Sequence, residues 1–183
     1  MSEDHVVRHG APTLAGIKTG SLFTCPVEDR KGFLREVSRY DRQLAPRGIR
    51  LRVLRFSERG ALLYLFRPER LRRDLADPAA RRLLGGLGYG DLTVEGMLRT
   101  LIRRLRSRDG FPHEIGAFLG YPIEDVEGFI RNGGDHCKCV GFWKVYGDET
   151  AARRRFAAYE ACTEAYCRRC ALGTPLRALA VAG

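Results

Sequence analysis

The chain contains 183 residues, of which 44% are hydrophobic and 9% aromatic. This is enough apolar material for a core and fits one domain of ordinary size, so it excludes a chain that is disordered throughout. The 32 Lys and Arg residues exceed the 22 Asp and Glu residues, which gives a formal net charge of +10. A basic balance of this kind raises the question of an anionic partner.

The positive charge is concentrated in one part of the chain. Residues 47–108 hold 16 Arg and 6 acidic residues, a difference of 16 − 6 = +10, whereas the remainder holds 16 residues of each sign. This segment can attract an anionic partner, either nucleic acid or an acidic protein, or it can form only a solvated face of arginine side chains. Both interpretations stay open.

Signals for export or membrane insertion are absent from the sequence. The start, Met1-Ser2-Glu3-Asp4, lacks the cationic and apolar regions of a signal peptide. Stretches without charged residues, such as 9–17 and 115–123, reach nine residues, about half the length of a membrane-spanning helix. We therefore expect a cytoplasmic protein, whose six cysteines are thiols or metal ligands rather than structural disulfides.

The first elements predicted along the chain form a βαββ unit. Residues 21–26 are typical of a buried strand stopped by proline, and residues 28–44 carry apolar side chains at helical spacing. Residues 49–56 then alternate apolar and charged side chains, and a turn at 57–60 leads to a second strand at 61–66. Such a unit predicts an α+β fold with a small antiparallel sheet covered by helices.

The rest of the chain is predicted to be mainly helical, within a single domain of residues 1–183. The expected helices span residues 68–75, 78–84, 94–105, 114–119, 123–130 and 149–171, with one further strand at 139–146. The helix at 94–105 has the clearest amphipathic pattern. The glycine-rich segment 85–90 is a flexible break and a possible subdomain hinge.

Residues 114–126 have the rhythm of a helix-turn-helix. The second helix carries Glu124, Asp125 and Glu127, whose carboxylates would repel DNA phosphates, so we do not expect DNA reading. The same rhythm is compatible with a helical hairpin that packs into the core.

Catalytic motifs are sparse. His113 and Glu114 are a candidate acid/base pair, but they also fit the first turn of a helix and lack the second histidine of a zincin. Residues 9–21 are rich in Gly, Thr and Lys and could form an anion-binding nest, although the glycine before Lys18 is displaced by Ile17, unlike in a P-loop. The sequence leaves open whether the protein is an enzyme and predicts no particular cofactor.

The cysteines of the C-terminal half are candidate metal ligands. They are Cys137, Cys139, Cys162, Cys167 and Cys170. Thiolates in this number could bind zinc or an iron–sulfur cluster. Their spacing matches neither a paired C-x₂-C frame nor a ferredoxin run, and a helix would hold Cys162 about 140° from Cys167. A structural role, with Cys170 as a small buried side chain, is the alternative.

Three separated segments resemble the signature segments of a known family. They are APTLAGIKT at 11–19, PHEIG through FLGYP at 112–122, and FWKVYGD at 142–148. From about His9 to the C-terminus the chain is similar to an uncharacterised bacterial family, domain of unknown function 3793, found mainly in anaerobic Firmicutes. The family has no established activity. Its members often carry a cysteine where this chain has Gly10, which argues against an indispensable thiol there.

The resemblance implies a site shared by residues of these segments. The ligand-binding candidates are His9, Thr13, Lys18, Tyr121, Trp143, Lys144, Tyr146 and Asp148. The leading hypothesis is an accessory or small-ligand-binding factor in anaerobic iron or redox metabolism, whose pocket brings His9, His113 and Lys144 together. One alternative is a module that binds nucleic acid or an acidic partner through residues 47–108; another is a cysteine-ligated zinc or iron–sulfur protein. Trp143 and Tyr146 are equally compatible with a core.

Overall fold

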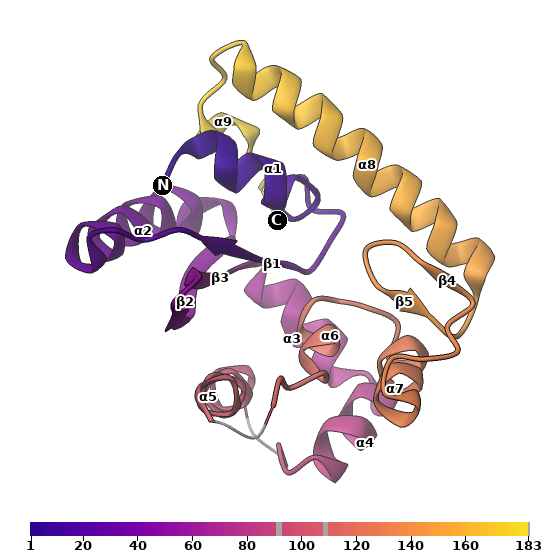
Figure 1. The fold of residues 1–183 in the computed structure, drawn as a ribbon. Coiled ribbons are helices and arrows are strands. Elements are labelled where there is room, and N and C mark those ends of the chain that lie inside the picture. The colour runs from indigo at the N-terminus through magenta and orange to yellow at the C-terminus, as the bar shows by residue number, and fades with distance from the viewer. Residues whose placement is uncertain (91–92, 108–109, 183) are drawn as a thin grey trace. The chain divides into compact units, whose positions relative to one another are not determined.

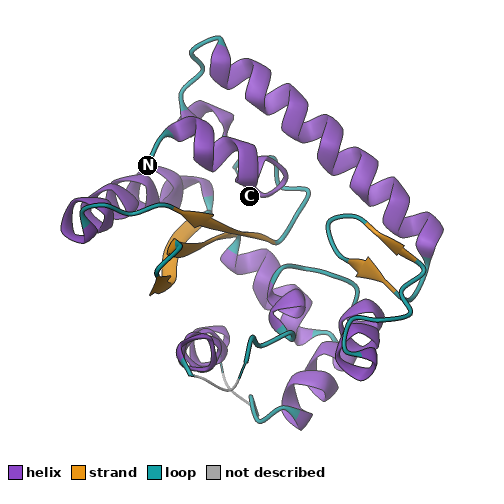
Figure 2. Cartoon of the chain, viewed as in Figure 1, coloured by secondary structure: helices purple, strands orange, loops and turns teal. Residues whose placement is uncertain are grey.

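The computed structural model describes residues 1–90, 93–107 and 110–182. It confirms the α+β fold class, with a helix-rich C-terminal half (Figure 1; Figure 2). The chain divides into two compact units, one comprising Met1–Glu69 with Tyr159–Gly183 and the other Arg70–Ala158. The segment 85–90 lies inside the second unit, and its role as a hinge stays a prediction, as does the single domain.

A three-stranded antiparallel sheet forms the centre of the first unit. Its strands are β1 (Gly20–Cys25), β2 (Arg50–Ser57) and β3 (Gly60–Phe66), in the order β1-β3-β2. Helix α2 (Arg30–Leu44) and the 3₁₀ turn η1 (Ala45–Arg47) connect β1 to β2. This arrangement confirms the βαββ unit.

The segment before β1 forms a helix that the sequence analysis missed. Helix α1 spans Glu3–Leu14, and the Ser2 side chain accepts a hydrogen bond from a backbone N–H of its first turn. Gly10 and Pro12 give this segment the composition of a loop. Gly10 packs closely on β3, because an added Cβ would lie 2.4 Å from Cδ2 of Leu65 and would require that side chain to shift.

The core of the first unit joins the sheet to three helices. Leu63 and Leu65 of β3 are fully buried in it, together with Leu14 of α1 and Leu44 of α2. The third helix is α9 (Leu176–Leu179), which returns the C-terminal segment to this core. Residues distant in sequence therefore share one apolar cluster, as a two-layer α+β unit requires.

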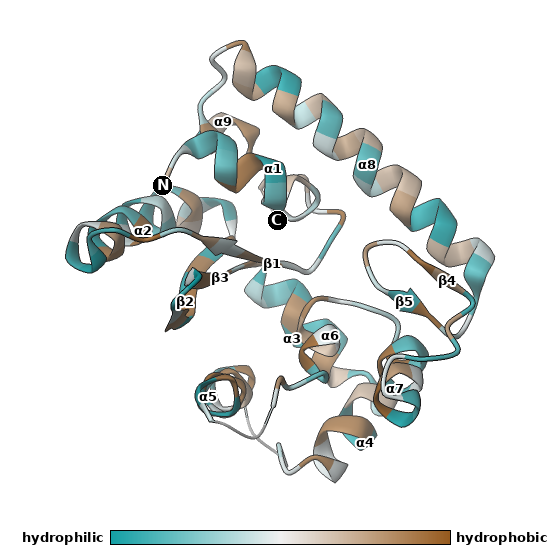
Figure 3. Cartoon of the chain, viewed as in Figure 1, coloured by the Kyte–Doolittle hydropathy of each residue, from teal (hydrophilic) through white to brown (hydrophobic). Residues whose placement is uncertain are grey.

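The second unit is mostly helical. Its helices are α3 (Pro68–Ala76), which begins at the boundary of the units, α4 (Pro78–Gly86), α5 (Val94–Arg106), α6 (Ile115–Phe118), α7 (Ile123–Asn132) and the first part of α8 (Glu149–Ala171). Helix α8 has the bounds that the sequence predicted, and the ends of the others differ by one or two residues. Figure 3 shows hydrophobic and hydrophilic residues intermixed along α8. None of the described helices is long and apolar enough to cross a membrane.

The single strand predicted at 139–146 is wrong, because the segment folds back on itself. Strand β4 (Cys139–Val140) pairs antiparallel with β5 (Lys144–Val145). The N–H of Gly141 donates to the carbonyl of Trp143 at 3.0 Å and closes the turn. An added Cβ on Gly141 would lie 2.3 Å from the Phe156 ring of α8, so the reversal depends on a close approach that hydropathy does not reveal.

Candidate functional site

The N-terminal signature segment is built around a buried arginine. Arg67 is 5% exposed; its Nε donates to the carbonyl of Thr13 at 2.7 Å, and its Nη2 donates to those of Leu14 and Val181 at 2.8 Å each. These bonds satisfy carbonyls at the end of α1 that have no partner inside the helix. Arg67 therefore ties α1 to the C-terminal segment, a role that its position before Pro68 did not reveal.

Thr13 and Lys18 are buried members of the same segment. The Thr13 and Ser21 hydroxyls lie 2.9 Å apart in a hydrogen bond. The N–H groups of Ile17 and Lys18 both donate to the Pro12 carbonyl at 3.0 Å, so these two amides are used within the fold rather than presented as an anion nest. Burial lowers the pKa of the Lys18 amine to about 8, because the charged form is poorly solvated there.

His9 lies on α1 and joins a small aromatic cluster. Its ring stacks on Phe23 of β1 at a centroid distance of 5.4 Å and contacts the inclined His5 ring at 4.7 Å. Partial burial, together with the neighbouring His5, lowers the pKa of His9. His9 belongs to the first unit, whereas His113 and Lys144 belong to the second; their predicted convergence with His9 stays a prediction.

The second and third signature segments meet at a buried carboxylate. Asp125 of α7 is 3% exposed; one oxygen accepts a hydrogen bond from the Trp143 indole at 2.7 Å. The other accepts from the backbone N–H groups of Tyr146 and Gly147 at 2.7 and 2.8 Å. The Trp143 ring in turn stacks on Tyr121 at 4.7 Å. We call this set (Tyr121, Asp125, Trp143, Tyr146 and Gly147) the Asp125 junction.

The remaining candidates of the third segment also make contacts within the fold. Lys144 donates to the Gly134 carbonyl at 2.7 Å, and the Asp148 side chain caps the start of α8 by accepting from the Ala151 N–H at 2.9 Å. Tyr146 packs its ring on Gly128, and its buried hydroxyl finds no hydrogen-bond partner among the described residues. Burial raises the pKa of this hydroxyl.

His113 and Glu114 are neighbours in sequence but lie in different environments, one exposed and the other buried. Glu114 is buried and accepts hydrogen bonds from the Tyr89 hydroxyl at 3.0 Å and from the Arg104 guanidinium at 2.9 Å. Burial, followed by the charge of Glu114, raises the pKa of Tyr89. His113 is exposed and its ring contacts Phe129 at 4.7 Å. Lys144 also lies over Phe129, at 5.8 Å, so His113 and Lys144 both contact this ring.

The five candidate cysteines are all free thiols and partly buried. Among the residues that the structure describes, no group of three or more His, Cys, Asp or Glu side chains could hold a metal ion. Cys167 and Cys170 pack against the core of the first unit, and burial raises the pKa of Cys162 and Cys170. The packing of Cys167 and Cys170 agrees with the structural role, and the metal-ligand role of the five cysteines stays a prediction.

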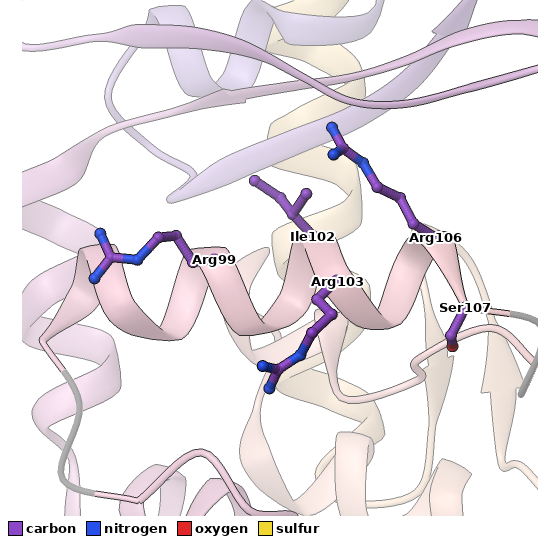
Figure 4. A pocket seen from close by; sticks show the side chains of 5 residues that line it. All are labelled: Arg99, Ile102, Arg103, Arg106 and Ser107. Atoms are coloured by element: carbon purple, nitrogen blue, oxygen red, sulfur yellow. The ribbon is translucent and has the colours of Figure 1, made fainter.

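Helix α5 carries an open hollow of about 560 Å³ on its surface (Figure 4). Its lining consists of Arg99, Ile102, Arg103, Arg106 and Ser107, which we call the α5 arginine face. Arg99, Arg103 and Arg106 are exposed, whereas Ile102 is half-buried between them. The described part of the chain provides no acidic partner for Arg99 or Arg103. This face lies inside the segment that carries the excess charge of the sequence.

Two of the comparisons with known proteins found no match, neither a curated protein nor a solved structure. A family model described as "Protein of unknown function (DUF3793)" matches residues 6–180. This range covers all three signature segments and nearly the whole of both units. The chain therefore belongs to the DUF3793 family.

Proposed function

We propose that the protein is a binding module for an acidic protein partner, which it holds on the α5 arginine face. The observation that carries the proposal is the hollow itself, which is lined by three exposed arginines and one apolar side chain, Ile102. Guanidinium groups present a rigid fork of donors that matches carboxylate geometry. The partner would supply carboxylates to Arg99 and Arg103, for which the described part of this chain provides none.

The composition of the hollow favours a protein over a nucleic acid. Ile102 offers an apolar contact between the charges, and arginine combined with apolar side chains is typical of the centre of a protein–protein interface. Helix α5 contains no aromatic residue on which a base could stack. Glu124 and Glu127 are exposed on α7, which also disfavours the helix-turn-helix interpretation.

Binding of a fluorescein-labelled peptide that combines glutamate and leucine tests this function by fluorescence anisotropy. The R99E/R103E double variant should weaken binding at least about tenfold, because like charges then face each other across the interface. The control is R154E/R155E on α8, where both arginines are exposed. It changes the net charge equally, from +10 to +6, since two reversals remove four charges. Equal weakening by both variants would contradict the site.

A duplex DNA oligonucleotide in the same assay separates the two classes of partner. Duplex binding that exceeds peptide binding and falls steeply with salt would replace the acidic protein by nucleic acid. Tighter binding to the peptide, together with weakening by I102S, would support the protein partner.

A second candidate function is the accessory role in anaerobic iron or redox metabolism, which the family resemblance implies. The Asp125 junction gives this role little support, because most of its polar groups form hydrogen bonds within the fold. The α5 arginine face gives stronger support to a binding module. Elemental analysis and the visible spectrum of protein purified without oxygen test this role, and the cysteine-ligated metal site with it. If the purified protein contains neither iron nor zinc, both the iron or redox role and the cysteine-ligated metal site are contradicted.

A further inference from the structure

Two histidines on α1 form a pair that the family match and the proposed function leave unused. His5 and His9 are four residues apart, so they lie on one face of the helix, one turn from each other. Their ring centroids are 4.7 Å apart with planes inclined at 61°. Both rings also contact Phe23 on β1, at 5.6 Å for His5 and 5.4 Å for His9, which fixes their positions from the sheet side.

The hydrogen bonding of His5 leaves one nitrogen ready to bind a metal ion. Its Nε2 lies 3.1 Å from the backbone carbonyl of Thr24. A carbonyl oxygen can only accept, so Nε2 carries the proton, and Nδ1 of the neutral ring keeps a lone pair. Metal-binding histidines commonly donate their other ring N–H to a carbonyl in this way, which fixes the tautomer and the orientation of the ring.

The separation of the two rings leaves room for a shared ion between them. With metal–nitrogen bonds of about 2.0–2.1 Å, two imidazoles bound at right or near-tetrahedral angles place their centroids roughly 4.4–5.3 Å apart. The observed 4.7 Å lies in this range. The structure shows no hydrogen bond from the His9 ring to another described residue, and His9 is exposed, so an ion can reach it from solvent.

We propose that His5 and His9 form a two-histidine site for a divalent transition-metal ion. Imidazole nitrogen suits Ni²⁺, Cu²⁺ and Zn²⁺, and water would complete the coordination. The neighbouring Asp4 is engaged with Arg8 at 3.3 Å, so it is not counted as a ligand. Such a site differs from the cysteine-ligated centre considered from the sequence, since it lies on α1 and uses no thiol.

Isothermal titration of the full chain with Ni²⁺ tests the proposal. The wild type should bind one equivalent, and H5Q and H9Q should each weaken binding at least about tenfold. H113Q is the matched control, because it removes an exposed imidazole of the second unit and should leave the affinity unchanged. The C137S/C139S variant should also keep it, which excludes a thiol site as the source of the signal.

Thermal unfolding provides a second readout that does not depend on the titration. A ligand that binds only the folded state raises the melting temperature, so Ni²⁺ should stabilise the wild type and H113Q but not H9Q. Circular dichroism without metal checks that H5Q and H9Q fold. The proposal is overturned if folded H9Q binds Ni²⁺ like the wild type, or if binding disappears only in C137S/C139S.

Discussion

The Asp125 junction and the α5 arginine face lie in the same unit but use their charges in opposite ways. The carboxylate of Asp125 is buried and accepts three hydrogen bonds, whereas Arg99 and Arg103 are exposed without an acidic partner in the described part of the chain. A charge without partners is costly only when it is buried. The buried Asp125 carboxylate contributes to the fold, whereas the proposed function assigns Arg99 and Arg103 to a partner.

The largest effect is expected at the Asp125 junction. D125A leaves the Trp143 indole and two backbone N–H groups without their acceptor, which should lower the free energy of unfolding by about 3–5 kcal/mol. E127A, on the exposed side of the same helix, should change it by less than about 0.5 kcal/mol. Urea unfolding of the two variants measures the difference, and similar values would break the comparison.

The same contrast between a buried and an exposed charge is expected for the arginines Arg67 and Arg99. R67M removes the donors to three carbonyls in the first unit and should cost about 3 kcal/mol of unfolding free energy. R99M on the α5 arginine face should leave stability within about 0.5 kcal/mol. A large loss in R99M would mean that the fold needs the arginine face, and it would weaken the proposed binding site.

Lys18 makes stability depend on pH. Its folded pKa of about 8 lies below the ordinary value of 10.5, so between these values the unfolded chain binds more protons and stability rises with pH. From pH 8 to pH 10 the wild type should gain about 2 kcal/mol relative to K18M. Paired urea titrations at several pH values isolate this contribution, since the other titrating groups are shared. A constant difference would show that Lys18 is not desolvated.

The smallest expected changes in stability are at two glycines, and they have opposite signs. An added Cβ on Gly128 would lie 2.4 Å from Cγ of Tyr146, whereas one on Gly85 in α4 would meet nothing within 4 Å. G128A should therefore lose about 1–2 kcal/mol of stability through overpacking. G85A should gain about 0.5–1 kcal/mol through helix propensity. Melting temperatures that move in the same direction would contradict this packing.

The regular elements were accessible from the sequence wherever their apolar pattern was strong. Helices α2, α5 and α8 and the β2–β3 hairpin follow from periodicity alone. Helix α1 and the β4–β5 hairpin did not, because Gly10 and Gly141 are explained by close contacts with Leu65 and Phe156. Such a contact joins distant segments and leaves no periodic trace.

The candidate site residues stay predictions, and their contacts within the fold could not be predicted from the sequence. Trp143, Lys144 and Asp148 have hydrogen-bond partners within the fold, and Arg67 was missed. The pairing of His5 with His9 was visible as a four-residue spacing, yet its significance depends on Phe23 and Thr24 of β1.

The sequence by itself determined the fold class, the βαββ unit, the family and the location of the excess charge. The fold class, the βαββ unit and the location of the charge depend on local periodicity and composition, and the family depends on the resemblance of three segments; the chain carries all of these whatever its packing. Only the tertiary structure decided which charges are buried. The sequence does not distinguish the carboxylate of Asp125 from that of Glu127, or the guanidinium of Arg67 from that of Arg99. Asp125 and Arg67 are buried because they form hydrogen bonds with residues 18 and 54 positions away, respectively. These bonds form only when the core brings the segments together.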